Sequence, residues 1–246
     1  MCTATWHTSA KNYNFFFNRD ELLSRTKERH PQASEYEGVS YIAPIDPPSN
    51  GTWLFVNQYG LSVGLLNHYP LDYQAFVESS TISRGSLVQS LISSKNIKEI
   101  KQRLEARDLK FFKPFTIITF DLLNAACIWQ WNGILLKKLF RTNKHMPLTS
   151  SSFHPKEIES FRKKLFLDKR KHYKGITETE FLQNFHKLHI PEKPAHSILM
   201  QRPDAQTSSF CQITVDSKMA KLRYSLKNSN EPKWLETNEY FLEISP

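Results

Sequence analysis

The sequence contains few cysteines, and they are not arranged to hold a metal or a disulfide framework. Cys2, Cys127 and Cys211 are widely separated in the 246 residues, and no CxxC or Cys/His ligand spacing occurs. This pattern argues against a zinc site and against a disulfide-stapled fold, so we expect neither a metal nor a cofactor. Cys127 and Cys211 lie in runs typical of strands, where a cysteine usually serves as a small buried hydrophobe.

Long hydrophobic runs are also absent. The longest apolar stretches, such as Phe15–Phe17 and Leu61–Leu66, are too short to span a bilayer. The first ten residues lack the basic region followed by an apolar run that marks a secretory signal. We therefore expect a soluble, cytoplasmic protein without a transmembrane segment.

Positive charge is in excess, with a formal net charge of +9 that is densest between Arg162 and Lys174. Ile158, Phe161 and Leu165 recur at helical spacing there, which predicts that the basic side chains lie on the opposite, solvated face. The less favoured interpretation is a site for an anionic partner such as nucleic acid, a phosphate-bearing cofactor or membrane lipid. The sequence lacks the stacking-aromatic motif of single-strand binders, so the nucleic-acid signal is weak.

The chain is long enough for one sizeable core, with 39% hydrophobic residues, and no linker or repeat divides it. We therefore expect a single domain over 1–246. Period-two alternation and short apolar runs predict strands over 2–7, 13–18, 40–43, 52–57, 62–67, 115–121, 125–131, 135–139, 196–201, 208–215, 221–226 and 240–244. Capping residues and helical periodicity predict helices over 83–92, 96–104, 154–168 and 177–188. The polar segment 19–37 is expected to run over the surface. This order predicts stacked antiparallel sheets with helices outside.

The predicted hairpin at the start of the chain gives Cys2 a position with chemical meaning. Its strands, 2–7 and 13–18, are joined by a turn at 9–12, which lies midway between Cys2 and the residues that follow Phe17. Pairing should therefore bring Arg19 and Asp20 close to Cys2. A guanidinium lowers the pKa of a nearby thiol, and a carboxylate can orient an amine.

Removal of the initiator Met1 would leave Cys2 as the first residue. Initiator methionine is normally removed when the second residue is small, as cysteine is. The exposed α-amine would titrate at about pH 7.7 to 8.0 and could act as general base toward the thiol of the same residue. The non-functional alternatives are an ordinary strand cysteine near a terminus and an ordinary charged loop.

Several motifs together resemble one known family. They are Met1-Cys2-Thr3, Asn18-Arg19-Asp20-Glu21, Tyr41-Ile42-Ala43-Pro44-Ile45-Asp46, Gly51-Thr52-Trp53 with Asn57 and Gly60, and Leu65-Leu66-Asn67. In combination they resemble the NRDE family, also called the Transport and Golgi organization 2 family. That family is similar to the N-terminal nucleophile (Ntn) hydrolases, particularly the choloylglycine hydrolase and penicillin V acylase branch. The resemblance implies an α+β fold, a four-layer αββα sandwich of two antiparallel sheets with helices on the outside.

The resemblance also implies roles for individual residues. Cys2 would be the nucleophile, assisted by Arg19 and Asp20, and Asn67 would donate to the oxyanion that forms on the attacked carbonyl. The remaining candidates for oxyanion or orienting roles are Asn18 and Ser150.

The chain departs from the pattern of the branch at two positions. A second asparagine is expected where Leu148-Thr149 is followed by Ser150. A late arginine is expected near the start of the strand 208–215, and the nearest one is Arg202.

The favoured function is therefore an N-terminal cysteine hydrolase or acyltransferase acting on a non-peptide amide or thioester bond of a small molecule. The alternative is a non-catalytic carrier for a hydrophobic acid, an acyl-CoA or a haem-like ligand on the same fold, which the two departures favour. A basic protein that binds nucleic acid or a membrane surface through the 162–174 cluster is a third hypothesis. Nothing in the sequence specifies an oligomeric state.

Overall fold

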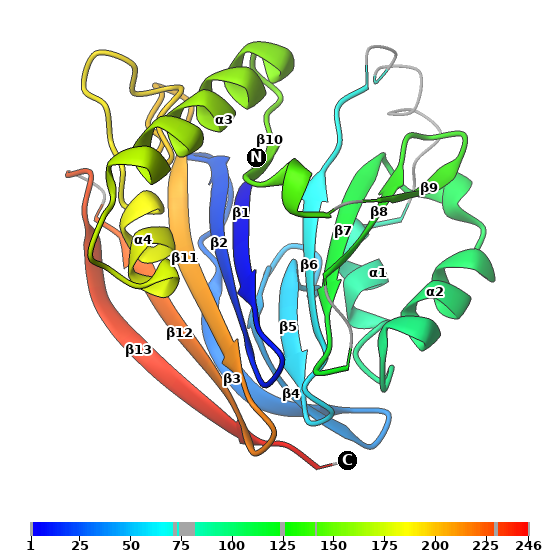
Figure 1. Ribbon diagram of the computed structural model, residues 1–246. Helices are drawn as coiled ribbons and strands as arrows, with labels where there is room; N and C mark the ends of the chain where they lie inside the picture. Colours follow the sequence, from blue (N-terminus) through cyan, green and yellow to red (C-terminus); the bar gives the residue numbers. More distant parts are fainter. Residues whose placement is uncertain are drawn as a thin grey trace.

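Two antiparallel sheets face each other, and helices cover their outer faces (Figure 1). The computed structural model describes residues 2–70, 73, 82–123, 126–140, 142–228 and 231–245. Within these ranges the chain is an α+β sandwich, which confirms the predicted fold class. Three residues that the sequence predictions include lie outside the described residues. They are Met1, whose removal is expected, Ala125, the first residue of the predicted strand 125–131, and Pro246, the last residue of the predicted domain 1–246.

The first sheet has six strands in the order β10-β1-β2-β11-β12-β13. These strands are β1 (Cys2–Thr8), β2 (Tyr13–Leu22), β10 (Leu148–Ser150), β11 (Ala205–Val215), β12 (Met219–Lys227) and β13 (Trp234–Glu243). Two helices cover its outer face, α3 (Pro155–His172) and α4 (Glu178–Phe185). The strand that begins with Cys2 therefore lies inside the sheet, between β10 and β2.

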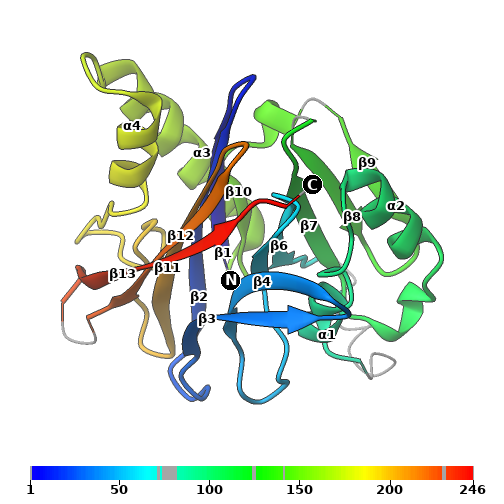
Figure 2. The same ribbon diagram turned by 90° about the horizontal axis from the view of Figure 1, so that it is seen from below.

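The second sheet has seven strands and follows the chain from β3 to β9. Its strands are β3 (Arg29–Tyr36), β4 (Val39–Ile45), β5 (Leu54–Asn57), β6 (Ser62–Asn67), β7 (Phe115–Phe120), β8 (Cys127–Trp131) and β9 (Leu136–Leu139). The helices α1 (Arg84–Gln89) and α2 (Ile97–Glu105) lie on its outer side, and the short 3₁₀ helices are η2 (Leu109–Phe111) and η3 (Thr142–His145). Seen from below, β13 of the first sheet lies beside β3 and β4 of the second (Figure 2).

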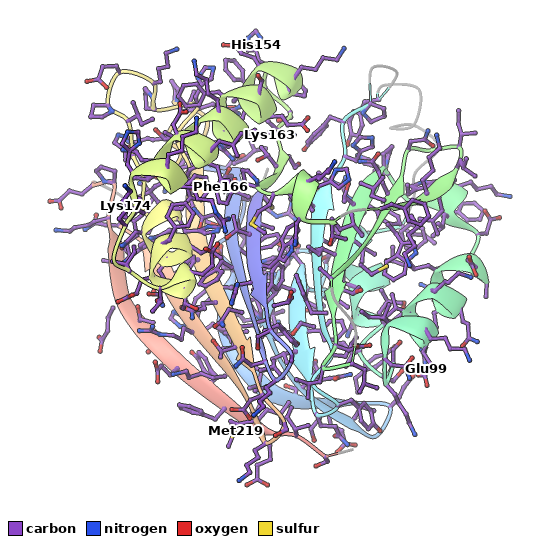
Figure 3. The ribbon with its side chains drawn as sticks, in the orientation of Figure 1. Glu99, His154, Lys163, Phe166, Lys174 and Met219 are labelled. Carbon is purple, nitrogen blue, oxygen red and sulfur yellow. The ribbon has the colours of Figure 1, made fainter. Side chains whose placement is uncertain are left out.

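Four helix starts that the sequence predicts are present, each with a local cause. Asn96 caps α2 by accepting from the backbone N–H of Glu99, and Thr177 forms a full capping box with Glu180 at α4. Pro155 opens α3, and Ser83 caps α1. Figure 3 shows Phe166 and Lys163 on α3; the phenylalanine is buried and the lysine exposed.

Two sequence predictions about secondary structure are wrong, and one strand has no counterpart among the predictions. Residues 29–36, expected to run over the surface, form the edge strand β3, and residues 148–150 form the short strand β10. Residues 196–201, expected as a strand, consist of turns and bends whose carbonyls accept hydrogen bonds from other side chains. No helix among the described residues is both long and apolar enough to span a membrane.

Aromatic side chains fill the space between the sheets. The ring of Phe15 on β2 lies 4.8 Å from that of Phe120 on β7, and the ring of Trp6 lies 6.1 Å from the same residue. Alternate residues of a strand face opposite sides of a sheet, so Trp6 and Cys2 face this space together. Gly64 on β6 lets the ring of Phe15 approach its backbone.

We expect Gly64→Ala to destabilise the protein. A Cβ atom at this position would lie 2.5 Å from Cζ of Phe15, whose fully buried ring is held by its neighbours. Overpacking of this kind typically costs about 1–3 kcal/mol, measurable as a lower free energy of unfolding in urea. The double variant Gly64→Ala/Phe15→Leu should lose less stability than the sum of the losses of the two single variants. If the two losses add, the assigned contact is contradicted.

Candidate functional site

Cys2 lies between two partners in the first sheet. Its Cα is paired with that of Arg19 on β2 and with that of Ser150 on β10. Residues directly opposite in antiparallel strands project to the same face, so the three side chains share the face that looks toward the second sheet. The hairpin register predicted from the midway turn is therefore present, and a strand that the sequence did not indicate adds Ser150.

A cavity of about 520 Å³ opens beside Cys2. Four of the predicted site residues line it: Cys2, Arg19, Asp20 and Asn67. The remaining lining includes Glu21, Arg25, Asp46, Trp53, Tyr69, Arg84, Lys113 and Arg202. Asn18 and Ser150 are not part of the lining. The structure thus gathers residues from β1, β2 and β6, far apart in the sequence, around one volume of space.

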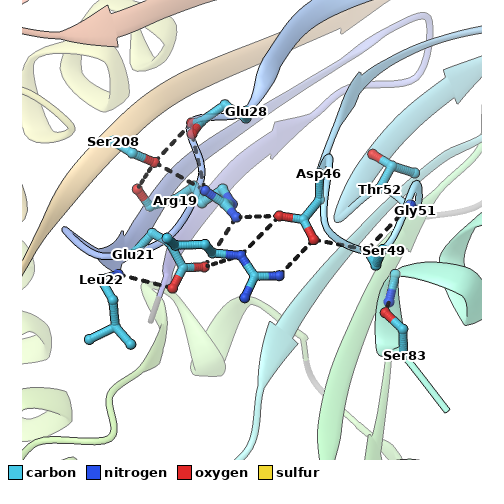
Figure 4. A network of polar contacts seen from close by, with 12 residues as sticks. Arg19, Glu21, Leu22, Glu28, Asp46, Ser49, Gly51, Thr52, Ser83 and Ser208 are labelled. Atoms are coloured by element: carbon cyan, nitrogen blue, oxygen red, sulfur yellow. Dashed lines mark hydrogen bonds and ion pairs between the residues drawn. The ribbon is translucent and has the colours of Figure 1, made fainter.

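Arg19 is held by acidic side chains on several sides (Figure 4). Its guanidinium lies 3.1 Å from Glu21, 3.2 Å from Glu28 and 3.0 Å from Asp46. The ring of Trp53 lies 4.4 Å from the guanidinium carbon, a cation–π contact. Only 6% of the Arg19 side chain is exposed, so these contacts fix the guanidinium in one orientation.

A β-bulge completes this network. The pairing of β11 with β2 shifts between Thr207 and Ser209, which leaves Ser208 out of register. The hydroxyl of Ser208 donates to Glu28 at 2.9 Å and accepts a longer hydrogen bond, of 3.4 Å, from Arg19. Bulges of this kind re-aim a side chain and are frequent beside functional sites.

The Cys2 thiol has a raised pKa, although Arg19 acts in the direction that the sequence predicts and favours the thiolate. Burial raises the pKa of Cys2 to about 11, and the Asp20 carboxylate acts in the same direction. The charged N-terminus, Arg19 and a hydrogen bond from the Asp20 backbone lower the pKa, and burial outweighs them. The reason is that the sulfur is removed from water, which disfavours the thiolate.

Asp20 is buried next to a second arginine, one that the sequence pattern predicts on the solvated face. Arg162 of α3 is 1% exposed and lies 3.5 Å from the Asp20 carboxylate. It also donates to the hydroxyl of Thr3 and to the carbonyl of Ser197, the latter at 2.7 Å. Burial lowers the pKa of Arg162 from its high ordinary value, and Asp20 opposes that shift. The hydroxyl of Thr207 donates to Asp20 at 2.6 Å.

The prediction that all the basic residues of this helix lie on its solvated face is therefore wrong for Arg162. The buried residues of α3 are Ile158, Arg162 and Phe166, so the buried stripe of this helix includes the arginine. A buried cation lies beside the Cys2 region although no arginine begins the strand 208–215. Arg202, the nearest alternative in sequence, lines the cavity and makes an ion pair with Asp204 at 2.7 Å.

Asn18 has its amide engaged on the helix side of the sheet. It donates to the carbonyls of His186 and Ile198 at 3.1 and 3.0 Å. Its carbonyl oxygen lies 2.9 Å from Nδ1 of His186, whose Nε2 lies 2.9 Å from the hydroxyl of Thr5. Burial lowers the pKa of His186 to about 3, so the ring is neutral and donates to Asn18 through Nδ1. Asn18 joins α4 to the sheet and does not reach the cavity.

Asn67 ends β6 at the wall of the cavity. Its amide nitrogen donates to the hydroxyl of Tyr69 at 2.9 Å, which orients the side chain. Ser150 is buried, and its hydroxyl has no hydrogen-bond partner among the described residues. The site therefore has an oriented amide and an unused hydroxyl near Cys2. In the described ranges, no three His, Cys, Asp or Glu side chains gather as metal ligands.

Several solved structures of Ntn-hydrolase-fold proteins are similar to this chain. An N-acylethanolamine-hydrolyzing acid amidase ortholog from Caenorhabditis elegans matches with a TM-score of 0.59 and 13% identity, over 87% of this chain and 92% of that one. Penicillin V acylase from Agrobacterium tumefaciens matches with a TM-score of 0.51 and 13% identity, over 99% and 86%. A variant of conjugated bile acid hydrolase from Clostridium perfringens matches with a TM-score of 0.53 and 12% identity, over 98% of this chain and 92% of that one. These likenesses show the Ntn-hydrolase fold.

Sequence comparison identifies the family. A search of curated proteins gives no significant match. A family model described as Transport and Golgi organisation 2 matches residues 1–240, nearly the whole chain. The chain therefore belongs to the Transport and Golgi organisation 2 family.

Proposed function

We propose that this protein is an N-terminal cysteine amidohydrolase or acyltransferase, and that it acts on a non-peptide amide or thioester bond of a small molecule. The observation that carries the proposal is the position of Cys2, which opens onto a cavity of about 520 Å³ together with Arg19, Asp20 and Asn67. The amide-hydrolase-like fold supports it.

In the proposed first step, the α-amine exposed by loss of Met1 takes the thiol proton of Cys2. The sulfur then attacks the substrate carbonyl and forms the C–S bond, and the carbonyl π electrons move to oxygen. Asp20 would orient the ammonium, because it follows the residue paired with Cys2 and so lies beyond the start of β1. Collapse of the intermediate breaks the bond to the leaving amine or thiol, which takes the proton from the ammonium. Water or an acceptor amine then resolves the acyl-enzyme.

The oxyanion of the tetrahedral intermediate needs fixed donors. Asn67, which lines the cavity, supplies an amide oriented by Tyr69, whereas the buried hydroxyl of Ser150 lies outside the lining. One such donor is typically worth about 10²–10³ in rate. Arg19 lines the cavity and is held by the surrounding carboxylates, and we propose that it fixes the geometry of the cavity next to Cys2.

The test is intact-mass spectrometry of purified protein before and after reaction with phenylacetyl thioesters. The proposal expects a chain that lacks Met1 and gains one acyl group, located on the N-terminal peptide. Retention of Met1, or acylation at another residue with Cys2 unmodified, would contradict it.

The alternative function is a carrier on the same fold, and the protonated state of Cys2 favours it, since a thiol with a pKa of about 11 is a weak nucleophile at neutral pH. A carrier would bind a hydrophobic acid or acyl-CoA without forming an acyl adduct. Its binding would survive Cys2→Ala.

The pH dependence of Cys2 alkylation should reveal the α-amine. With extra residues before Met1, no free amine adjoins Cys2, and the charged N-terminus that lowers the pKa of its thiol is displaced. Burial then keeps that pKa high, so the rate with iodoacetamide should rise about tenfold per pH unit from pH 7 to 10. In the processed chain the amine accepts the proton, so the rate should level off at about pH 8. Identical profiles for the two forms, followed by intact mass, would argue against the amine as base.

A further inference from the structure

The wall of the cavity carries more positive than negative side chains. The basic lining residues are Arg19, Arg25, Arg84, Lys113 and Arg202, and the acidic ones are Asp20, Glu21 and Asp46. Such an imbalance in a concave site attracts anions, provided that the cations are not already paired. The pairing of each cation therefore decides whether the excess is available to a ligand.

Three of the five cations are neutralised within the protein. Arg19 and Arg25 share Asp46, at 3.0 and 2.6 Å, and Arg202 pairs with Asp204. Arg84 and Lys113 make no ion pair with any of the described residues. Both side chains are half-buried, so their charges are less screened than charges at the open surface.

Arg84 and Lys113 lie next to each other because two segments run side by side. The backbone N–H of Ile82 donates to the carbonyl of Phe111 at 3.1 Å. The guanidinium of Arg84 donates to the carbonyl of Pro114, the residue after Lys113, at 3.0 Å. This contact engages one nitrogen of the guanidinium and leaves other N–H groups of its fork for a ligand.

The same carbonyl connects the two cations to the predicted oxyanion donor. Pro114 also accepts from the backbone N–H of His68, at 3.1 Å, and His68 follows Asn67. Tyr69, which orients Asn67, is close enough to Arg84 that this cation opposes the rise of the tyrosine's pKa by burial. The cations therefore lie at the Asn67 side of the cavity that Cys2 also lines.

We propose that Arg84 and Lys113 form a subsite for an anionic group, a carboxylate, sulfonate or phosphate, carried by the amide or thioester substrate. This inference rests on the proposed function for its choice of substrate. A bidentate guanidinium and a neighbouring ammonium match the oxygens of such a group. Neutral amides of the same shape would bind the cavity without this contact.

The experiment compares N-phenylacetylglycine with N-phenylacetylglycinamide, which differ in one negative charge. Isothermal titration calorimetry on the Cys2→Ala chain measures binding without turnover. We expect the glycine compound to bind about tenfold more tightly, and more weakly as salt is raised, because charge-assisted hydrogen bonds are screened. The Arg84→Gln/Lys113→Gln double variant, built on the Cys2→Ala chain, should lose that preference.

The matched control is Lys98→Gln/Arg107→Gln, which removes the same charge at exposed positions outside the cavity lining. It should keep the preference. Equal dissociation constants for the two compounds, binding of neither, or a preference that survives in the Arg84/Lys113 double variant would overturn the subsite. Release of glycine by the unmodified protein is measured separately. Anion-selective binding without that release would count against the proposed hydrolase and leave the subsite standing.

Discussion

Replacing Cys2 by alanine is expected to lower the rate of amide or thioester cleavage by on the order of 10³-fold or more, because the nucleophile of the proposed acyl-enzyme is removed. Residual turnover would come from the cavity and its oxyanion donors alone. The measurement is the release of amine or thiol from phenylacetyl substrates, together with the loss of the acyl adduct in intact-mass spectra.

Two controls separate chemistry from folding. Cys211→Ala removes a thiol that is also buried, on β11, and that does not line the cavity. It should keep turnover while losing stability through the cavity it creates. The thermal midpoint of Cys2→Ala should stay close to that of the unmodified chain. Full activity in Cys2→Ala, or an equal loss of activity in Cys211→Ala, would refute the assignment of Cys2.

The part of the site that the sequence predicts depends on short-range pairing. The turn at 9–12 fixes the register of the hairpin, so the partner of Cys2 follows from counting residues, and the structure has Arg19 there. The choice of Asn67 depends instead on the resemblance to the family, and the structure has this residue at the end of β6 in the cavity lining. The two-sheet fold follows in the same way from alternating segments and capped helices.

Long-range packing decides the features that the sequence prediction missed. β3 reads as a surface segment because it is polar and contains Pro31, but as an edge strand it pairs only with β4. Residues 196–201 contain an apolar run at 198–200, yet the carbonyls of Ser197 and Ile198 accept hydrogen bonds from Arg162 and Asn18. Hydrogen bonds between residues more than 30 positions apart override the local preference there.

Arg162 was missed because its sequence context indicates the opposite environment. It is followed by Lys163 and Lys164, both exposed, so a periodic pattern read on apolar residues alone assigns all three to the solvated face. The helical spacing from Ile158 to Arg162 and on to Phe166 is the one available signal. Only the position of Asp20 on a different element explains why a cation belongs in that stripe.

Replacing Arg162 by methionine is expected to lower the free energy of unfolding by about 3–5 kcal/mol. The change leaves Asp20 as a buried carboxylate without its cation. It also removes the hydrogen bonds that Arg162 donates to Thr3 and to the carbonyl of Ser197. Such a loss is a large part of the stability of a typical domain. Urea denaturation measures it, and Arg162→Lys, which keeps the charge, should show a smaller loss.

Lys163→Met is the matched control, since it removes the same charge from the next, exposed position of α3 and should change stability by less than about 0.5 kcal/mol. Combining Arg162→Met with Asp20→Asn removes both charges of the pair, so the double variant should be more stable than the sum of the single losses predicts. Additive losses would show that Arg162 stabilises the protein independently of Asp20, through packing and its hydrogen bonds to Thr3 and Ser197. Non-additive losses would tie the helix to the carboxylate beside Cys2, and would explain how a charge from α3 stabilises the start of β1.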